Sequence, residues 1–343
     1  METYIKDTVR HEVDDVVLNT IKNTIYQLED TEKQPTEKQL KTLPLLQFRA
    51  ITPDTLPLIN TLIQDAKSRT CDYTIGGIFM WIDRFAYEYC VYSDTLFIKG
   101  VSETDENKTA FSLPIGQLPL EYSVSLIMEY CAYYDIKPLF SAIPEDRLDY
   151  LMSITSGTAE ELVDWADYLY EAEALAELTG KKYNKKRNHV NRFMTENPNY
   201  VFEPLSDALI PEVLLFHTGM SPESEPGHDD SSQYEKEQCT YVLNHYNRYP
   251  FEGAVLRDET GEICAYTCGE VIGDTLYIHI EKMNHEIAGS GETINKLYAQ
   301  YMTHRHPYVR YINREEDCGD EGLRHAKESY NPVMRLRKFN VYA

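Results

Sequence analysis

Beyond the first 45 residues, short apolar runs alternate with amphipathic stretches in an order that occurs twice along the chain. Residues 46–51 predict a strand, residues 56–66 a helix, and residues 86–101 two strands around a Ser-Asp turn. Residues 120–135 predict a longer amphipathic helix. The order β-α-α-β-β-β-α-β-α-β then returns in the second half. We therefore expect an α/β fold of two units, each a mixed β-sheet with helices on both faces.

The two halves also begin with similar text, "FRAITPDTLPLINTLI" in the first and "FEPLSDALIPEVLLF" in the second. Before these segments, residues 14–28 have apolar residues at helical spacing, and a polar linker follows them. The boundaries that follow are a short helical N-terminal extension at 1–44, a first domain at 45–178 and a second at 179–343. A chain of 343 residues exceeds the size at which one core keeps growing, which also favours two domains.

Composition and charge narrow the class of protein. No apolar run approaches the roughly 20 residues that a membrane-spanning helix needs, and the N-terminus lacks the apolar region of a signal peptide. The seven cysteines include no CxxC pair, which is typical of free thiols and predicts a cytoplasmic protein. A net charge of −23 disfavours broad nucleic-acid binding. Any anionic partner must therefore meet a local basic surface.

One such surface is predicted at residues 180–193, "GKKYNKKRNHVNRF", which carries six Lys or Arg side chains and no carboxylate. At helical spacing, Lys182, Lys185, Lys186 and His189 share one side. Two interpretations stay open. The stretch is a solvated linker helix paired with the acidic residues of "EAEALAEL", or it receives an anionic ligand.

A second candidate is the loop Gly289-Ser290-Gly291, which joins a predicted strand at 275–282 to a helix. Glycines let backbone amides turn toward a ligand, and a helix N-terminus favours an anion. The alternative is an ordinary turn before a helix. No Walker loop, nucleophile elbow or HExxH motif is present.

The segment "YINREEDCGDEGLRHAKESY" supplies the third candidate. Asn313 and Arg314 lie where a strand ends, and Tyr330 ends the next helix, where it is a proton donor or a core residue. The acids between them suit a helix N-terminus and have no metal-loop spacing. His304 and His306 flank an arginine at a helix end, as the helix dipole favours. We therefore expect no metal site.

Three stretches together resemble a known family: "DWADYLYEAEALAELTGKKYNKKRNHVNRF", "YIHIEKMNHEIAGSGETINKLY" and "YINREEDCGDEGLRHAKESYNPVMRLRKFNV". They resemble the C-terminal domain of phosphatidylglycerol lysyltransferase, especially its stand-alone soluble members, over about residues 45–343. The resemblance implies tandem acyltransferase folds of the GCN5-related N-acetyltransferase (GNAT) type. Membrane-bound relatives move an aminoacyl group from charged tRNA to a lipid headgroup, and Fem-type relatives move it to a cell-wall precursor.

The resemblance implies an acyl- or aminoacyltransferase. Because the first half has no loop comparable to that of the second, we expect one site, in the second domain. Glu281 would be the general base and Tyr330 would protonate the leaving group. No cofactor would be tightly bound; acyl-coenzyme A or aminoacyl-tRNA would be the co-substrate, and a small molecule with an amine or hydroxyl the acceptor. The donor's anionic part would be received by Gly289, Ser290, Gly291, Lys185, Lys186, Arg187, Asn313 and Arg314.

Two departures from the family pattern keep another class of function open. Glu286 stands where an acetyltransferase loop would have Gln or Arg, and the first half has no comparable loop. A non-catalytic module that senses a small anionic metabolite or tRNA is therefore the alternative. A tRNA-binding accessory protein would need the basic helix but neither Glu281 nor Tyr330.

Overall fold

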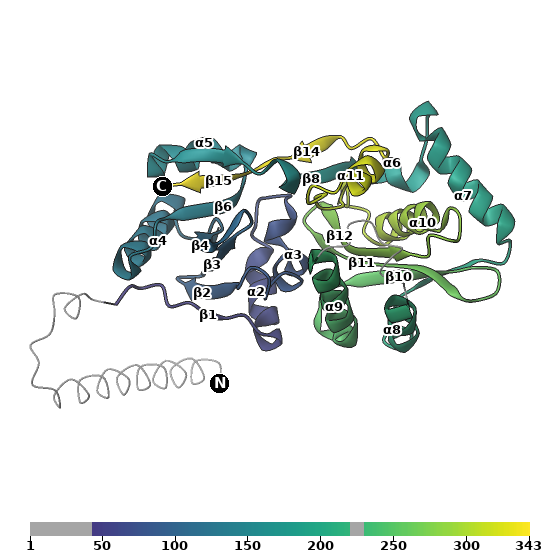
Figure 1. Cartoon of the computed structure of the whole chain (residues 1–343), viewed down its shortest axis with the longest axis horizontal. Helices are drawn as coiled ribbons and strands as arrows, with labels where there is room; N and C mark the ends of the chain where they lie inside the picture. The colour runs from purple at the N-terminus through teal and green to yellow at the C-terminus, as the bar shows by residue number, and fades with distance from the viewer. Residues whose placement is uncertain (1–42, 220–229) are drawn as a thin grey trace, which may run out of the picture. The chain divides into compact units, whose positions relative to one another are not determined.

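The structure, a computed structural model, describes residues 43–219 and 230–343. Residues 44–343 belong to one unit, in which two β-sheets carry the fold (Figure 1). The helical extension predicted at residues 1–44 lies outside the described residues, apart from its last two.

The first sheet has the strand order β1-β2-β3-β4-β6-β15-β7, with β5 paired to β3. Neighbouring strands are antiparallel except β4 and β6, which are parallel. Its strands are β1 Arg49–Ala50, β2 Glu88–Tyr92, β3 Thr95–Ser102, β4 Asp105–Phe111, β5 Ile115–Gly116, β6 Leu139–Pro144, β7 Thr158–Glu161 and β15 Lys338–Tyr342.

The second sheet has the order β14-β8-β13-β12-β11-β10-β9, and β12 with β13 is its parallel pair. Its strands are β8 Asp167–Glu171, β9 Val201–Pro204, β10 Glu252–Arg257, β11 Ile263–Ile272, β12 Thr275–Met283, β13 Tyr311–Asn313 and β14 Met334–Leu336. Written from β9, this order matches the first sheet strand for strand, with the parallel pair at the same place. The predicted tandem α/β fold is confirmed.

The two sheets exchange one strand. The β15 strand, from the C-terminus, lies in the first sheet where β8, from the middle of the chain, lies in the second. Figure 1 shows the C-terminal ribbon passing directly from β14 to β15. The sequence predicts one closing strand at 333–341, and this is wrong, because Arg337 separates two strands of different sheets. The predicted boundary at 178 and 179 therefore does not separate the sheets, since β8 precedes it and β15 follows it.

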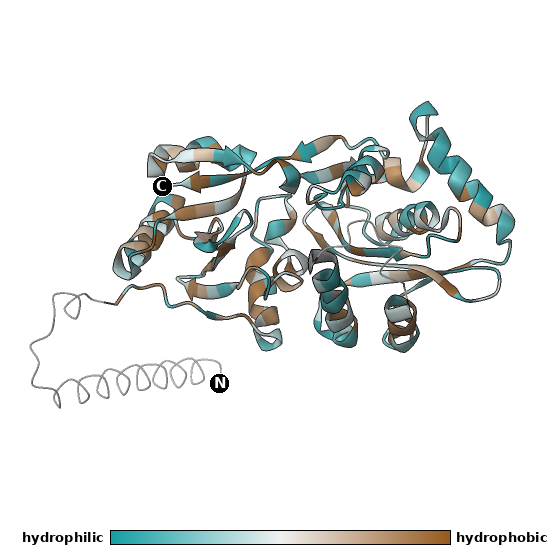
Figure 2. Cartoon of the chain, viewed as in Figure 1, coloured by the Kyte–Doolittle hydropathy of each residue, from teal (hydrophilic) through white to brown (hydrophobic). Residues whose placement is uncertain are grey.

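Helices cover the sheets through apolar faces of the kind that the sequence predicts. Helix α4 buries Val124, Ile127 and Cys131 and ends where Asp135 adopts a left-handed conformation. The helices are α2 Leu56–Ile63, α3 Ile75–Phe79, α4 Leu120–Tyr134, α5 Glu145–Thr155, α6 Ala172–Glu177, α7 Asn184–Glu196, α8 Ile210–Gly219, α9 Asp230–Asn244, α10 Ser290–Arg305 and α11 Glu321–Glu328. Figure 2 shows hydrophilic residues along most of α7, the helix of the basic stretch.

The described residues include no helix with both the length and the apolar character to cross a bilayer. The cysteines are free thiols, and all but Cys318 are buried.

Candidate functional site

The parallel strands β12 and β13 separate part-way along the second sheet. They pair at three positions, the last being Tyr277 with Asn313, while β12 continues to Met283. A bulge in β12 places His279 between two residues that pair normally with β11. The end of β12 therefore lacks β13 as a neighbour, and the side chains beyond the separation are free to build a site.

Glu281 lies on this part of β12, and polar groups from two other elements meet it. Arg314, just after β13, donates from Nη2 to Glu281 Oε1 at 2.7 Å. Asn295, on α10, donates from Nδ2 to Oε2 at 3.1 Å. Only 9% of the Glu281 side chain and 14% of the Arg314 side chain are exposed, so this ion pair is largely withdrawn from solvent.

Tyr330 completes the site through its ring. The Arg314 guanidinium carbon lies 4.8 Å from the ring centroid, and Lys186 Nζ lies 4.0 Å from it, within the range of cation–π attraction. Burial raises the pKa of Tyr330 well above its ordinary value, so the phenol keeps its proton. Lys186 also pairs with Glu292 of α10 at 3.4 Å. We call Glu281, Arg314, Tyr330, Lys186, Glu292 and Asn295 the Glu281 cluster.

The pKa values of the two cations of the cluster are shifted in opposite directions. Burial lowers the pKa of Lys186, although Glu292 opposes the change. Burial would lower the pKa of Arg314 too, but the Glu281 carboxylate outweighs it and raises that pKa. Two polar atoms of the cluster are buried without a partner among the described residues, Arg314 Nη1 and Asn295 Oδ1. Unpaired buried groups are costly, so each is available to a ligand.

The three basic residues predicted to act together have different surroundings. Lys186 reaches the Glu281 cluster, whereas Lys185 is exposed. The Arg187 guanidinium donates to the carbonyl oxygens of Leu178 and Gly180 and holds the connection between α6 and α7. Arg187 therefore has a structural contact in place of a free charge.

The Gly289-Ser290-Gly291 loop packs against the protein. Gly289 caps α10 at a φ of +83°, and a Cβ there would lie 2.3 Å from the backbone oxygen of His189. Ser290 donates its hydroxyl to Asn284 O at 3.1 Å, and Gly291 faces the Met283 sulfur. The first glycine is thus required by the close approach of α7, the helix that carries Lys186.

Gly289→Ala is expected to destabilise the fold by about 1–3 kcal/mol, because a left-handed conformation and a backbone contact both oppose the new methyl group. Urea unfolding measures the loss. Gly261→Ala, at φ +88° with open space around its Cβ position, is the matched control and isolates the conformational part. Equal losses in the two variants would contradict the packing of α7 on this loop.

Asn313, predicted as a donor contact, lies outside the Glu281 cluster. Its Nδ2 donates to Arg69 O and to Asp167 Oδ2, both at 2.7 Å, and its Oδ1 accepts from the amide of Glu315. Through Arg69, these hydrogen bonds connect the second half of the chain to the first.

Asn295 and Glu292 are functional candidates that the sequence did not predict. Their signal is helical spacing: they lie three residues apart on α10, directly after the glycine loop.

A largely buried group of three charged side chains, which we call the His279 clamp, connects β12 and β11 to the residues after β13: His279, Glu270 and Glu315. His279 lies 2.9 Å from Glu270 on β11 and 2.7 Å from Glu315, the residue after Arg314. Glu270 also accepts from the amide of Gly76, whose lack of a Cβ makes room for the His279 ring. Both carboxylates outweigh burial and raise the pKa of His279 to about 10. The His279 clamp fixes the backbone that presents Arg314.

One group of described residues has metal-ligand geometry: Cys71, Asp167 and Glu316. Lys338 Nζ lies among them, 2.7 Å from Asp167, 3.6 Å from Glu316 and 3.4 Å from the Cys71 sulfur. The lysine ammonium therefore stands where a cation would bind.

A hollow of about 430 Å³ lies beside the loop that follows β12. Its described lining combines apolar side chains with Glu212, Glu262 and Glu286. The volume suits a small molecule, and the carboxylates favour a cationic group.

The model of the family described as phosphatidylglycerol lysyltransferase, C-terminal, matches residues 64–342. No curated protein matches the sequence.

Solved structures share the fold. A conserved protein of unknown function from Bacteroides thetaiotaomicron is 28% identical, with a TM-score of 0.79 over 87% of this chain and 99% of that one. A domain from Agrobacterium fabrum, assigned to the C-terminus of a lysylphosphatidylglycerol synthetase, is 14% identical, with a TM-score of 0.61 over 84% of this chain and 92% of that one. FemX is 9% identical, with a TM-score of 0.57 over 86% of this chain and 97% of that one. The tandem acyltransferase-type fold is confirmed.

Proposed function

Because the chain belongs to the phosphatidylglycerol lysyltransferase C-terminal family, we propose that it moves an aminoacyl group from charged tRNA to a small acceptor, at the Glu281 cluster. Acyl or aminoacyl transfer is the kind of function that this family carries. The structure has a single cluster at the separated strands of the second half that combines a carboxylate, a protonated phenol and two cations, within the described residues.

The observation that favours an aminoacyl donor is the pair of unpartnered atoms beside Glu281. Arg314 Nη1 is a donor and Asn295 Oδ1 is an acceptor, and each belongs to a side chain already bonded to the Glu281 carboxylate. An aminoacyl ester carries the complement on adjacent carbons, a carbonyl oxygen and an α-ammonium group. A simple acetyl group would leave the Asn295 oxygen unpaired, at a cost of about 1–3 kcal/mol.

In the proposed reaction the acceptor amine or hydroxyl attacks the ester carbonyl carbon, and Glu281 accepts the proton of the nucleophile. Arg314 stabilises the negative charge that develops on the carbonyl oxygen. Tyr330, held neutral by burial, donates its proton to the departing ribose oxygen. Glu281 then releases the nucleophile's proton to solvent, and Tyr330 takes one up from solvent, which restores both side chains. The products are an aminoacylated acceptor and uncharged tRNA.

The basic residues of the α7 region support a tRNA donor. Lys181, Lys182 and Lys185 are exposed on a protein of net charge −23, and Lys186 of the same stretch enters the site. A local basic surface attracts phosphates even on an acidic protein. The carboxylate of Glu286 in the loop disfavours the pyrophosphate of coenzyme A.

A non-catalytic binding module is the second candidate. It is favoured by the two hydrogen bonds that already occupy both oxygens of Glu281, which a base must give up in part to accept a proton.

Turnover separates these candidates. Charged tRNA carrying a labelled amino acid is incubated with the protein and a pool of small amines and alcohols, and labelled acceptor is measured. Catalysis predicts labelled product and release of uncharged tRNA. Binding that protects the ester from hydrolysis, without product, would favour the binding module.

Lys186→Ala is expected to weaken binding of 3′-aminoacylamino-3′-deoxyadenosine, a stable mimic of the tRNA terminus, by about 10-fold or more, because a largely buried ammonium is lost from the site. Lys185→Ala is the matched control, exposed and next in sequence, and should change the affinity of this small mimic less than about twofold. Equal losses would contradict the assignment of Lys186 to the site.

A further inference from the structure

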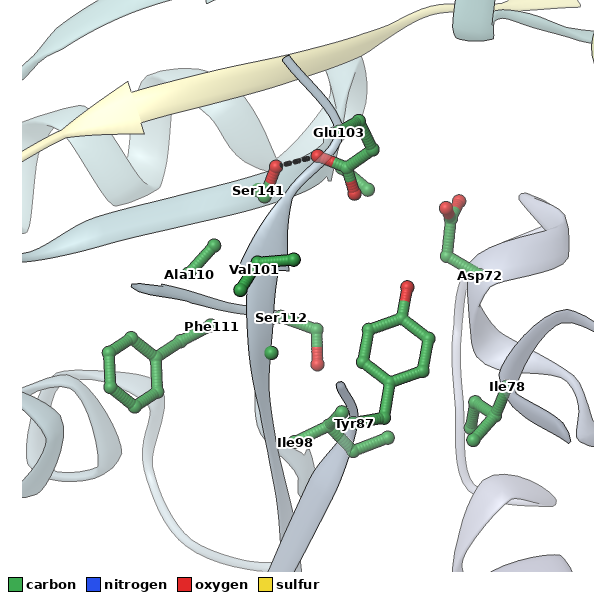
Figure 3. A pocket seen from close by; sticks show the side chains of 12 residues that line it. Asp72, Ile78, Tyr87, Ile98, Val101, Glu103, Ala110, Phe111, Ser112 and Ser141 are labelled. Atoms are coloured by element: carbon green, nitrogen blue, oxygen red, sulfur yellow. Dashed lines mark hydrogen bonds between the residues drawn. The ribbon is translucent and has the colours of Figure 1, made fainter. Parts of the chain in front are cut away.

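The first half contains a cavity that the proposed function does not use. Its volume is about 30 Å³, and it lies where β3, β4 and β6 meet (Figure 3). One water needs about 10–15 Å³ by this measure, so the cavity accommodates a group of two or three non-hydrogen atoms. None of its lining residues belongs to the Glu281 cluster.

The cavity corresponds to the site of the second half. β4 and β6 are the parallel pair of the first sheet, and they pair at only one position, Phe111 with Phe140. Beyond this position Ser141 and Ala142 bulge opposite Asn340, and Ala142 has a φ of +53°. The same two strands of the repeat therefore separate in both halves, and the bulge turns Ser141 toward the cavity.

Polar groups converge on one end of the cavity. Figure 3 shows the Tyr87 hydroxyl pointing toward the space between the carboxylates of Glu103 and Asp72, and it takes part in no hydrogen bond among the residues drawn. Ser141 donates its hydroxyl to Glu103 Oε2. The remainder of the lining is mainly apolar and includes Ile78, Ile98, Val101, Ala110, Phe111 and Ala142.

The charge around this end is unbalanced. Lys338 Nζ lies 2.9 Å from Asp72 Oδ2. The same ammonium group also pairs with Asp167 and Glu316, so three carboxylates share one positive charge. Glu103 adds a further carboxylate at the cavity. Burial raises the pKa of both Glu103 and Asp72, and a neighbouring carboxylate adds to each increase, Asp72 for Glu103 and Asp167 for Asp72. A cation bound in the cavity would stabilise the ionised forms of these two carboxylates.

We propose that the cavity binds the terminal aminomethyl group, –CH₂–NH₃⁺, of a primary alkylamine. The ammonium would donate to Glu103 and to the Tyr87 oxygen, while the methylene would lie against the apolar wall. A metal ion fits less well, because Ca²⁺ and Mg²⁺ need six or more oxygen ligands and only five of the twelve lining residues carry a side-chain oxygen. The site would lie in the first half of the chain, for which the sequence predicts no site.

Ethylammonium chloride is the probe, titrated into the full chain and followed by thermal unfolding. Three non-hydrogen atoms limit the dissociation constant to the order of 1 mM or weaker. Tetramethylammonium chloride at the same concentrations controls for ionic strength and lacks N–H donors. A second probe is blocked lysine, Nα-acetyl-lysine-N-methylamide, whose amine resembles that of a protein side chain. Stabilisation by both probes means that the site also accepts lysine side chains of proteins or peptides. Stabilisation by ethylammonium alone means that it accepts only small free amines.

Glu103→Gln is expected to weaken ethylammonium binding by at least about 10-fold, whereas Glu106→Gln, an exposed neighbour, should leave it unchanged. If Glu103→Gln does not fold, Ser112→Val narrows the cavity by one non-hydrogen atom with both carboxylates retained and should weaken binding by at least about 10-fold. Glu281→Gln should bind the amine as the wild type does. Unchanged binding in Glu103→Gln or Ser112→Val, loss of binding in Glu281→Gln, or equal stabilisation by tetramethylammonium would overturn the proposal.

Discussion

Glu281→Gln is expected to lower the rate of aminoacyl transfer by about 10²–10⁴-fold, the usual contribution of a general base. Glutamine keeps the shape of the side chain and a carbonyl oxygen for Arg314 or Asn295, but it does not take up a proton from the nucleophile. The measurement is single-turnover transfer from charged tRNA, in which chemistry is separated from product release.

Binding provides the necessary second measurement. The affinity of Glu281→Gln for the aminoacyl-adenosine mimic should stay within about 10-fold of the wild type, because Arg314 Nη1 and Asn295 Oδ1 remain available. Glu286→Gln, in the loop after β12, is the matched control and should transfer at the wild-type rate. A Glu281→Gln protein with unchanged transfer would exclude the residue as the base, and loss of mimic binding alone would make it a binding residue.

His279→Gln is expected to reduce the free energy of unfolding by about 3–5 kcal/mol, the usual effect of breaking a buried ion pair. The variant leaves Glu270 and Glu315 buried without their shared cation. Urea unfolding of the two proteins at one pH gives the difference. His304→Gln, at the exposed end of α10, is the control and should be nearly neutral.

The pH dependence of this difference has a definite sign. The folded protein raises the pKa of His279 from 6.5 to about 10, so protonated His279 stabilises the folded state fully below pH 6.5. This stabilisation is lost as the pH rises through 10. The difference between wild type and His279→Gln should therefore shrink from pH 6 to pH 10. A difference that is constant or grows over this range would mean that His279 is neutral in the fold.

The repeat could be predicted from the sequence because each half must bury one sheet with local apolar patterns. The exchange of β8 and β15 could not, since strand partners are chosen by tertiary contacts that no local pattern encodes. The segment "VMRLRKFNV" illustrates the limit: its alternation predicts a strand, but not the change of sheet at Arg337.

The residues of the candidate site also differ in how well the sequence predicts them. Glu281, Tyr330, Lys186 and Arg314 were all predicted from the sequence and lie together. Arg187 and Asn313 have partners elsewhere in the fold, because charge and position in the sequence do not show which way a side chain turns. Asn295 was missed since a single amide on a helix has no distinctive pattern, although it bonds the central carboxylate.

The most direct measurement is thermal unfolding of the protein with charged tRNA, uncharged tRNA and acetyl-coenzyme A in turn. A ligand at about 100 times its dissociation constant stabilises by roughly 2.7 kcal/mol. Aminoacyl transfer at the Glu281 cluster predicts stabilisation by charged tRNA that exceeds that by uncharged tRNA, and none by acetyl-coenzyme A. Equal stabilisation by the two tRNAs, or stabilisation by acetyl-coenzyme A alone, would contradict an aminoacyl donor.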